Sequence, residues 1–464
     1  MASATGFPAR LLFILSLIAF SFAFIASTKA DEPRKLSDFV IKEFGQPPAI
    51  PDGPYSESLE RAVETAFIKS MQNGTWGRDE SIALSEIADS KDPRVVWLIS
   101  DLLRFVAQPQ LNVALADTAS KLLGKDLQGR NPWGTVTDHL IAWNIPAPPD
   151  YLRAKRAIYT TIVPGWDKIF TEGNVDWRLV SWGGVLIDDR PHDKTDDVCN
   201  CIPAADNPEV VKAEDAKWPK DDDVIFGITI NGEARAYPRQ IMEVREMVND
   251  TLGGRHLGIP YCTLCGAAQA FFTDRQPDGV ERPILRTSGL LNRSNKVMYD
   301  LNTYSVFDTF LGHAQTGPLA EKGIKLEQAT VVTTTWGAWK KAHPATTVLH
   351  ERYALGRDPD FRNTRDANGP IFPVGDVDPR LPVHEDIIGA ITASGKPIAF
   401  QRSQAFVALQ RGEEIAFENV RLKLDAGGIR AVDADGTDLG SHQAFWFAWS
   451  QFHPKTALWP ASDG

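Results

Sequence analysis

The sequence predicts an α+β protein: an N-terminal helical module, similar to a helical repeat, followed by a mainly β, internally duplicated domain with short helices. Apolar residues recur at three- and four-residue spacing before residue 160, then at alternate positions after residue 220. One tryptophan-containing motif also occurs twice. The predicted organisation is a signal peptide at 1–30, a helical module at 31–160, a linker and loop region at 161–220, a first β-rich copy at 221–350 and a shorter second copy at 380–460.

The first thirty residues have the features of a secretory signal peptide. Arg10 precedes an apolar run at 11–26, and the small residues Thr28 and Ala30 precede Asp31. The run is shorter than the roughly 20 residues that a membrane-spanning helix needs. We therefore expect cleavage after Ala30 and a periplasmic or secreted protein with no transmembrane segment after cleavage. Thiols oxidise in those compartments unless a metal holds them.

The composition excludes several classes of function. The chain has 464 residues, of which 43% are hydrophobic, so it can bury large cores. Its 49 Lys and Arg residues against 60 Asp and Glu residues give a net charge of −11, which argues against nucleic-acid binding. Neither a P-loop nor a dinucleotide-binding fingerprint occurs, so no nucleotide cofactor is indicated. The expected partner is a small molecule or an envelope protein of unidentified kind.

Four amphipathic helices are predicted in the N-terminal module. Their apolar residues follow helical spacing at 58–71, 79–88, 93–106 and 113–123. Asp92-Pro93 is typical of a helix start, because proline fits the first turn of a helix. The pattern favours packing or docking rather than chemistry.

The C-terminal half predicts β-hairpins. Residues 224–237 alternate apolar and polar positions around Asn231-Gly232, which supplies the positive φ angles of a two-residue turn. A similar unit recurs at 387–400. The sequence Trp-x-x-Trp-x-x-x-His-Pro-x-Thr starts at Trp336 and again at Trp446. Its spacing places both tryptophans and the histidine on one face of a short helix, where we interpret His343 and His453 as capping residues.

An ordered series of short motifs resembles a known family. The motifs are Asn231-Gly232-Glu233-Ala234-Arg235-Ala236-Tyr237-Pro238, Val248-Asn249-Asp250-Thr251-Leu252-Gly253-Gly254, Tyr261-Cys262-Thr263-Leu264-Cys265-Gly266, Ser288-Gly289-Leu290-Leu291, Val297-Met298-Tyr299-Asp300, Gly317-Pro318-Leu319-Ala320 and Thr334-Thr335-Trp336. Over about residues 190–460 the chain resembles the exported bacterial domain-of-unknown-function family numbered 3179. The resemblance implies a secreted or lipid-anchored bacterial protein and no particular activity. One departure is Arg245-Glu246, where the family pattern has a His-Glu pair, so a mechanism resting on that imidazole does not transfer.

The cysteines carry the most specific chemistry in the sequence. Cys262-Thr263-Leu264-Cys265-Gly266 lies between two apolar stretches, which predicts a strand, a tight turn and a second strand. Such a turn resembles the knuckle of zinc ribbons, in which two thiolates bind one metal ion. Cys199 and Cys201, or His256, are the candidates to complete the ligand set. We therefore expect a metal-binding or metal-dependent envelope protein with a zinc or copper ion.

Two other interpretations of the cysteines stay open, and so does the question whether the protein is an enzyme. The cysteines could form structural disulfides in a non-catalytic binding or scaffold module. Alternatively, Cys262 and Cys265 could form the redox centre of a thiol enzyme. A hydrolase-like set of Ser288, Asp300, Glu246 and His313 is also conceivable, but no Gly-x-Ser-x-Gly elbow is present.

Overall fold

The computed structural model describes residues 36–194, 198–351 and 369–460. The predicted signal peptide at 1–30 lies outside the described residues, so its cleavage stays a prediction. None of the helices in the described ranges is both long enough and apolar enough to cross a membrane.

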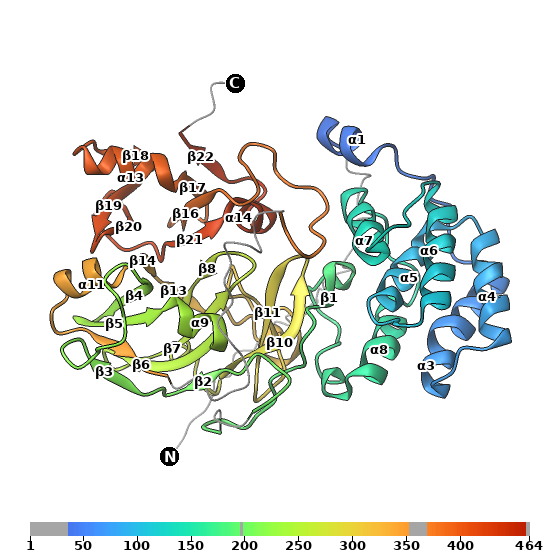
Figure 1. Cartoon of the computed structure of the whole chain (residues 1–464), viewed down its shortest axis with the longest axis horizontal. Helices are drawn as coiled ribbons and strands as arrows, with labels where there is room; N and C mark the ends of the chain where they lie inside the picture. The colour runs from blue at the N-terminus through green and yellow to red at the C-terminus, as the bar shows by residue number, and fades with distance from the viewer. Residues whose placement is uncertain (1–35, 195–197, 352–368, 461–464) are drawn as a thin grey trace, which may run out of the picture. The chain divides into compact units, whose positions relative to one another are not determined.

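Helices fill the N-terminal part of the described chain (Figure 1). They are α1 (Asp38–Phe44), α2 (Glu57–Val63), a π-helical turn (Glu64–Lys69), α3 (Ser70–Asn73), α4 (Arg78–Asp89), a 3₁₀ turn (Pro93–Val95), α5 (Val96–Leu103), α6 (Pro109–Leu123), α7 (Pro132–Ala142) and α8 (Tyr151–Ile162). All four predicted helical segments are confirmed, and α1, α7 and α8 are additional. The prediction that the helices form a repeat is not confirmed.

Local sequence explains where several of these helices begin. The Ser37 and Ser56 side chains accept hydrogen bonds from the backbone N–H groups of the first turns of α1 and α2. Pro109 and Pro132 occupy the first positions of α6 and α7, where a missing N–H costs nothing. The helices pack through their apolar faces, and the 3₁₀ turn at Pro93 confirms the start predicted at Asp92-Pro93.

Strands dominate the chain after residue 180. They are β1 (Val180–Trp182), β2 (Ala205–Asp206), β3 (Val210–Lys212), β4 (Val224–Ile230), β5 (Glu233–Pro238), β6 (Met247–Leu252), β7 (Arg255–Cys262), β8 (Ala267–Ala268), β9 (Ala270–Phe272), β10 (Leu285–Asn292), β11 (Asn295–Asp300), β12 (Val306–Asp308), β13 (Glu327–Ala329), β14 (Val332–Thr335), β15 (Thr347–Leu349), β16 (Asp386–Ile391), β17 (Pro397–Gln401), β18 (Ile415–Phe417), β19 (Val420–Asp425), β20 (Gly428–Asp433), β21 (His442–Phe445) and β22 (Ala457–Trp459). Short helices lie between them: α9 (Arg239–Arg245), α10 (Gly317–Glu321), α11 (Trp336–Ala342), α13 (Arg402–Gln410) and α14 (Trp446–Phe452).

The described strands form five sheets, so a mainly β domain with short helices is confirmed. The sheet orders are β1-β10-β11-β12, β13-β9-β7-β6-β2, β14-β4-β5-β15-β3, β21-β16-β17-β22 and β18-β19-β20, and β8 pairs with β7.

Two of these sheets share one design. In the first, β4 and β5 form an antiparallel hairpin, β14 pairs antiparallel with β4, and β15 pairs parallel with β5. In the other, β16, β17, β21 and β22 repeat these four positions and directions. We call them the first and second Trp sheets, because α11 and α14 follow β14 and β21 in the same way. The shared strand order is consistent with the predicted internal duplication, which is not itself confirmed.

Each Trp sheet packs a tryptophan ring on a glycine. Trp339 of α11 lies on Gly227 of β4, and Trp449 of α14 lies on Gly389 of β16. The indole Nε1 of each donates a hydrogen bond of 2.9 Å to a threonine hydroxyl, Thr346 in the first sheet and Thr456 in the second. The predicted hairpin turn is also confirmed, since Asn231 and Gly232 have φ angles of 50° and 85°.

Candidate functional site

The segment around Cys262 has the predicted strand, turn and strand. Strand β7 ends at Cys262, the turn closes with a 3.2 Å hydrogen bond from Cys265 N to Cys262 O, and β8 follows at Ala267. Gly266 has a φ of 63°, which side-chain-bearing residues rarely adopt. Cys262 and Cys265 form a disulfide within this turn. Both residues are buried, with exposed fractions of 1% and 0%.

Glu246 lies beside this turn in an unusual backbone conformation. It is the residue after α9 and has a φ of 49°, in the left-handed region that residues other than glycine seldom occupy. Its carbonyl oxygen accepts a 2.9 Å hydrogen bond from Tyr261 N, which ties it to the end of β7. Backbone strain of this kind costs about 1–3 kcal/mol and tends to occur at functional sites.

A buried ion pair joins Glu246 to Lys296 of β11. Lys296 Nζ lies 2.6 Å from Glu246 Oε2 and donates a 2.8 Å hydrogen bond to the Glu246 carbonyl oxygen. Thr263 Oγ1, inside the cysteine turn, donates a 3.0 Å hydrogen bond to Glu246 Oε1. Each charged side chain is only 5% exposed. Removing one partner of such a buried pair would leave the other charge uncompensated, so Glu246 and Lys296 are held together in this position.

The ion pair and the disulfide border one cavity of about 180 Å³. The polar lining comes from Glu246, Lys296, Thr263, Thr287 and Cys262. Most other lining residues are apolar: Val185, Ile202, Leu264, Leu290, Leu291, Val297, Ile371 and Phe372. A mostly apolar cavity with a few converging polar groups is typical of a small-molecule site. This arrangement places an ammonium group, a carboxylate and a disulfide sulfur on the lining of one cavity.

The other two cysteines form a separate disulfide in the loop before β2. Cys201 is buried and Cys199 is partly exposed. Their sulfur atoms and a carboxylate oxygen of Asp188 all lie within 4.8 Å of one another. A second group of possible ligands, His192, Asp193 and Asp206, is equally compact.

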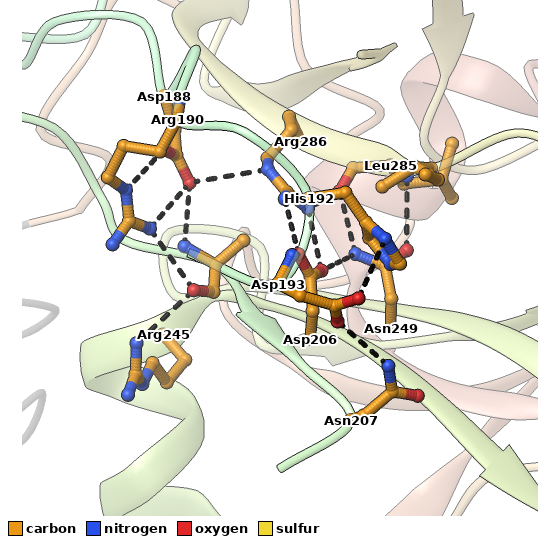
Figure 2. Close-up of polar contacts among 12 residues, drawn as sticks. Asp188, Arg190, His192, Asp193, Asp206, Asn207, Arg245, Asn249, Leu285 and Arg286 are labelled. Carbon is orange, nitrogen blue, oxygen red and sulfur yellow. Dashed lines mark hydrogen bonds and ion pairs between the residues drawn. The ribbon is translucent and has the colours of Figure 1, made fainter. Parts of the chain in front are cut away.

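A buried network of charges lies next to this loop (Figure 2). Arg286 of β10 donates hydrogen bonds of 2.8 and 2.5 Å to the carboxylate oxygens of Asp206, and Arg190 pairs with Asp188. Asn249 links Asp206 to the backbone of Leu285. Burial alone would raise the pKa of Asp206, but the hydrogen bonds and charge of Arg286 outweigh it and hold that pKa below its usual value. Because the Arg286 and Asp206 charges are satisfied internally, this part of the network is structural.

The structure brings the predicted site residues together in two pairs. Cys262 lies with Cys265, and Cys199 lies with Cys201. In the described part of the chain, no compact group of three possible metal ligands combines the two pairs. His256 lies on β7 six residues before Cys262, a distance of roughly 20 Å along an extended strand, and its Nδ1 lies 3.0 Å from Thr251 Oγ1. His256 is thus well separated from Cys262 along the strand, and metal binding by the predicted residues stays a prediction.

Sequence reasoning missed Lys296, and it considered Glu246 only in a hydrolase-like set for which the sequence had no elbow motif. Ser288 donates its hydroxyl hydrogen to the Val297 carbonyl oxygen at 2.6 Å, and Asp300 accepts the Ile284 N–H at 2.8 Å, so each is hydrogen-bonded to the backbone. His313 lines a different cavity. The only signal in the sequence was Arg245-Glu246, the one position singled out in the sequence as a departure from the family that the chain resembles.

The fold and site define an α+β protein with a five-sheet β domain that holds a buried ion pair beside a Cys-x-x-Cys disulfide. Residues 199–438, more than half of the chain, match the family described as "Protein of unknown function (DUF3179)". The chain belongs to this family, which confirms the resemblance in the sequence. No curated protein and no solved structure matched the chain.

Proposed function

We propose that this chain is an exported thiol–disulfide exchange protein whose redox centre is Cys262 and Cys265. One observation carries the proposal: the disulfide borders a cavity together with the buried Lys296–Glu246 pair. Structural disulfides need no ionisable neighbours, whereas exchange depends on the charge around the reacting sulfur. Export rests on the composition of residues 1–30.

The exchange needs an external dithiol as its reductant. One thiolate of the dithiol attacks the Cys262 sulfur, which forms a mixed disulfide and releases the Cys265 sulfur as a thiolate. The second thiolate of the dithiol then attacks the dithiol sulfur that is bonded to Cys262. This closes the disulfide of the oxidised reductant and releases the Cys262 sulfur as a thiolate. Two electrons pass to the protein, two protons follow to its thiolates, and the dithiol leaves as a disulfide. We assign the attacked sulfur to Cys262 because this residue lines the cavity.

Lys296 and Glu246 have distinct roles in this scheme. The Lys296 ammonium lines the same cavity as Cys262 and favours a negative charge on the Cys262 sulfur, which leaves as a thiolate in the second step. Glu246, which also accepts a hydrogen bond from Thr263 of the cysteine turn, holds the Lys296 ammonium in place beside that turn. Leu264 also lines the cavity, so a larger side chain at that position would block the approach of the reductant.

The experiment follows each disulfide separately in the folded protein. The chain is treated with dithiothreitol, free thiols are alkylated at intervals, and peptides with each cysteine pair are quantified by mass spectrometry. We expect Lys296→Met and Leu264→Trp to slow reduction of Cys262–Cys265 by about tenfold or more and to leave Cys199–Cys201 unaffected. Glu246→Gln should slow the same reduction, because it weakens the hold on Lys296. Glu243→Gln, at a buried glutamate that does not line the cavity, is its matched control and should react as the parent does. A disulfide that stays oxidised until the protein unfolds, or one reduced equally fast in Lys296→Met, contradicts the proposal.

A structural disulfide is the second candidate, favoured by the packing of the same turn. Cys262 and Cys265 belong to an apolar cluster with Phe445, Trp446 and Trp449 of the second Trp sheet. The Cys265 carbonyl oxygen also accepts a 2.8 Å hydrogen bond from Phe445 N. This candidate predicts that a Cys262→Ser, Cys265→Ser double variant loses about 2 kcal/mol of stability, as expected for so short a loop, and that the native protein exchanges no thiols.

The metal hypothesis uses the same two sulfurs in their reduced state. Zinc or copper would then bind to the Cys262 and Cys265 thiolates, and the cavity would have to supply the remaining ligands. Elemental analysis of the reduced, folded protein tests it. About one ion per chain, lost in Cys262→Ser, supports metal binding, whereas exchange without bound metal supports the redox proposal.

A further inference from the structure

A short segment before β16 borders the candidate cavity. We call residues 371–375 the strap. Its first two residues, Ile371 and Phe372, line the cavity that Cys262 also lines. Ile371 is 47% exposed and is the only exposed residue among those that line the cavity, whereas Cys262 is 1% exposed. The strap therefore forms part of the cavity wall that faces solvent.

The N-terminal helices hold the backbone of the strap. One carboxylate oxygen of Asp138, in α7, accepts hydrogen bonds of 2.9 Å from both Val374 N and Gly375 N. Gly375 has a φ of 65°, and a methyl group added there would lie 2.3 Å from the Ile141 side chain. Glycine is the residue that fits both this backbone conformation and this close approach. The strap is therefore seated directly on α7.

Arg104, the residue after α5, holds the strap at a second point. Its Cζ atom lies 5.4 Å from the Phe372 ring centroid and 5.1 Å from the Trp182 ring centroid, within the range of a cation–π interaction. Its Nε also donates a 2.8 Å hydrogen bond to the Trp182 carbonyl oxygen. Gly183, the next residue, lines the same cavity. One arginine of the N-terminal helices thus contacts both the strap and the segment that follows β1.

The cavity that the strap borders is small. Its volume of about 180 Å³ is below the range of about 300–1,000 Å³ that is typical of sites for drug-sized ligands. Cys262 and Cys265 are both almost fully buried. A sulfur that attacks Cys262 must therefore enter the cavity, because the attacking thiolate and the disulfide have to come into contact. A small dithiol meets this requirement with the strap in place, whereas a protein dithiol carries a surface that the strap obstructs.

We propose that the N-terminal helices select the reductant of the Cys262–Cys265 disulfide. Through Asp138 and Arg104 they hold the strap beside the cavity, so that a small dithiol reaches the Cys262 sulfur and a protein dithiol does not. This selection rests on the exchange function proposed above, in which the dithiol gives two electrons and two protons and leaves as a disulfide. Asp138 and Arg104 do not line the cavity, so they are positioning residues that act through the strap.

Reduction of the Cys262–Cys265 disulfide by two reductants of different size tests the selection. The folded full chain is treated with dithiothreitol or with reduced thioredoxin, a protein dithiol, and the disulfide is followed by alkylation and mass spectrometry. We expect dithiothreitol to reduce the parent and thioredoxin to leave it oxidised over the same time. Gly375→Ala, which displaces the strap from α7, and Phe372→Ala, which opens the cavity wall, should raise the thioredoxin rate at least about tenfold and the dithiothreitol rate at most about twofold.

Arg104→Met should change the two rates in the same direction, and Arg153→Met is its matched control. Arg153 is an arginine of α8 that pairs with Glu64, so its loss should leave both rates unchanged. Hydrogen exchange of the peptide that contains Val374 and Gly375 reports on the strap without any redox chemistry. Its exchange should be faster by at least about tenfold in Gly375→Ala, because the hydrogen bonds to Asp138 are weakened.

The outcomes distinguish this selection from the exchange function itself. If neither reductant acts on the folded parent, the exchange function fails and the selection fails with it. If dithiothreitol and thioredoxin both reduce the parent within the same time, exchange stands and the selection is overturned. The selection is also overturned if hydrogen exchange shows a released strap in a variant that circular dichroism shows to be folded, while thioredoxin still leaves the disulfide oxidised. Where the variants do not fold, the contrast between the two reductants on the parent decides.

Discussion

The two Trp sheets have the same strand order and the same tryptophan-on-glycine packing, and they differ in what their connections carry. The connection between β5 and β14 holds Glu246, the cysteine turn and Lys296. The matching connection between β17 and β21 holds α13 and the three-stranded sheet β18-β19-β20. The shared elements therefore build the core, and the candidate site at the cysteine turn lies in a connection where the sheets diverge. Equivalent substitutions at matching positions of the two sheets should therefore have similar effects on stability. A substitution at a position that has no counterpart should have an effect that the other sheet does not show.

The largest effect is expected at Arg286, which has no counterpart in the second Trp sheet. Arg286→Leu leaves the buried carboxylate of Asp206 without its cation, so the free energy of unfolding should fall by about 3–5 kcal/mol. Urea denaturation at pH 7 measures the loss. Because the pKa of Asp206 is lowered in the folded state, its contribution is present above the unfolded pKa of about 4 and disappears as the pH falls through the folded value. A variant as stable as the parent at pH 7 would contradict the structural role of the pair.

Glycine substitutions test the shared packing. A methyl group added at Gly227 or Gly389 would overlap the ring of Trp339 or Trp449, so each alanine variant should lose about 1–3 kcal/mol of stability. The two losses, measured by urea denaturation, should be similar. A large loss in one sheet alone would mean that the two tryptophans do not play equivalent roles.

The loss of stability at low pH should depend on the second Trp sheet, which has His442 where the first Trp sheet has Val332. His442 is buried with a pKa of about 3, well below the value near 6.5 in an unfolded chain. The neutral ring makes its full contribution to the free energy of unfolding above pH 6.5. That contribution is lost as the pH falls from 6.5 toward 3, and about 2 kcal/mol of it has been lost at pH 5. His442→Val should therefore flatten the loss of stability between pH 7 and pH 5, as measured by thermal denaturation. An unchanged pH profile would show that His442 does not titrate in this way.

The smallest expected difference concerns the threonines that receive the indole N–H groups. Thr346→Val and Thr456→Val each remove one hydrogen bond of 2.9 Å, at a cost of about 1 kcal/mol. The Thr346→Val variant should lose more stability than Thr456→Val. The Thr346 hydroxyl also donates to the Ala234 carbonyl oxygen at 3.0 Å, whereas the Thr456 hydroxyl lies 3.4 Å from the Ala457 carbonyl oxygen. Melting temperatures of the two variants, compared at the same pH, check the order.

Local features of the fold were predictable from the sequence. The Asn231-Gly232 turn, the helices in the N-terminal part and the turn between Cys262 and Cys265 depend on residues that are neighbours in the chain. The ion pair of the candidate site was not predictable, because Lys296 and Glu246 are 50 residues apart. No periodicity or motif relates them, and the left-handed conformation of Glu246 follows from its place between α9 and β6.

The sequence by itself determined the family, the class of fold, the repeated tryptophan motif and the cysteine turn, because each is written in spacing along the chain. Tertiary structure decided which cysteines pair, which charges meet at the cavity, and that His442 rather than a valine faces Trp449. The physical reason is that desolvation and charge pairing depend on distances in space. Those distances are set only when strands far apart in sequence form their sheets.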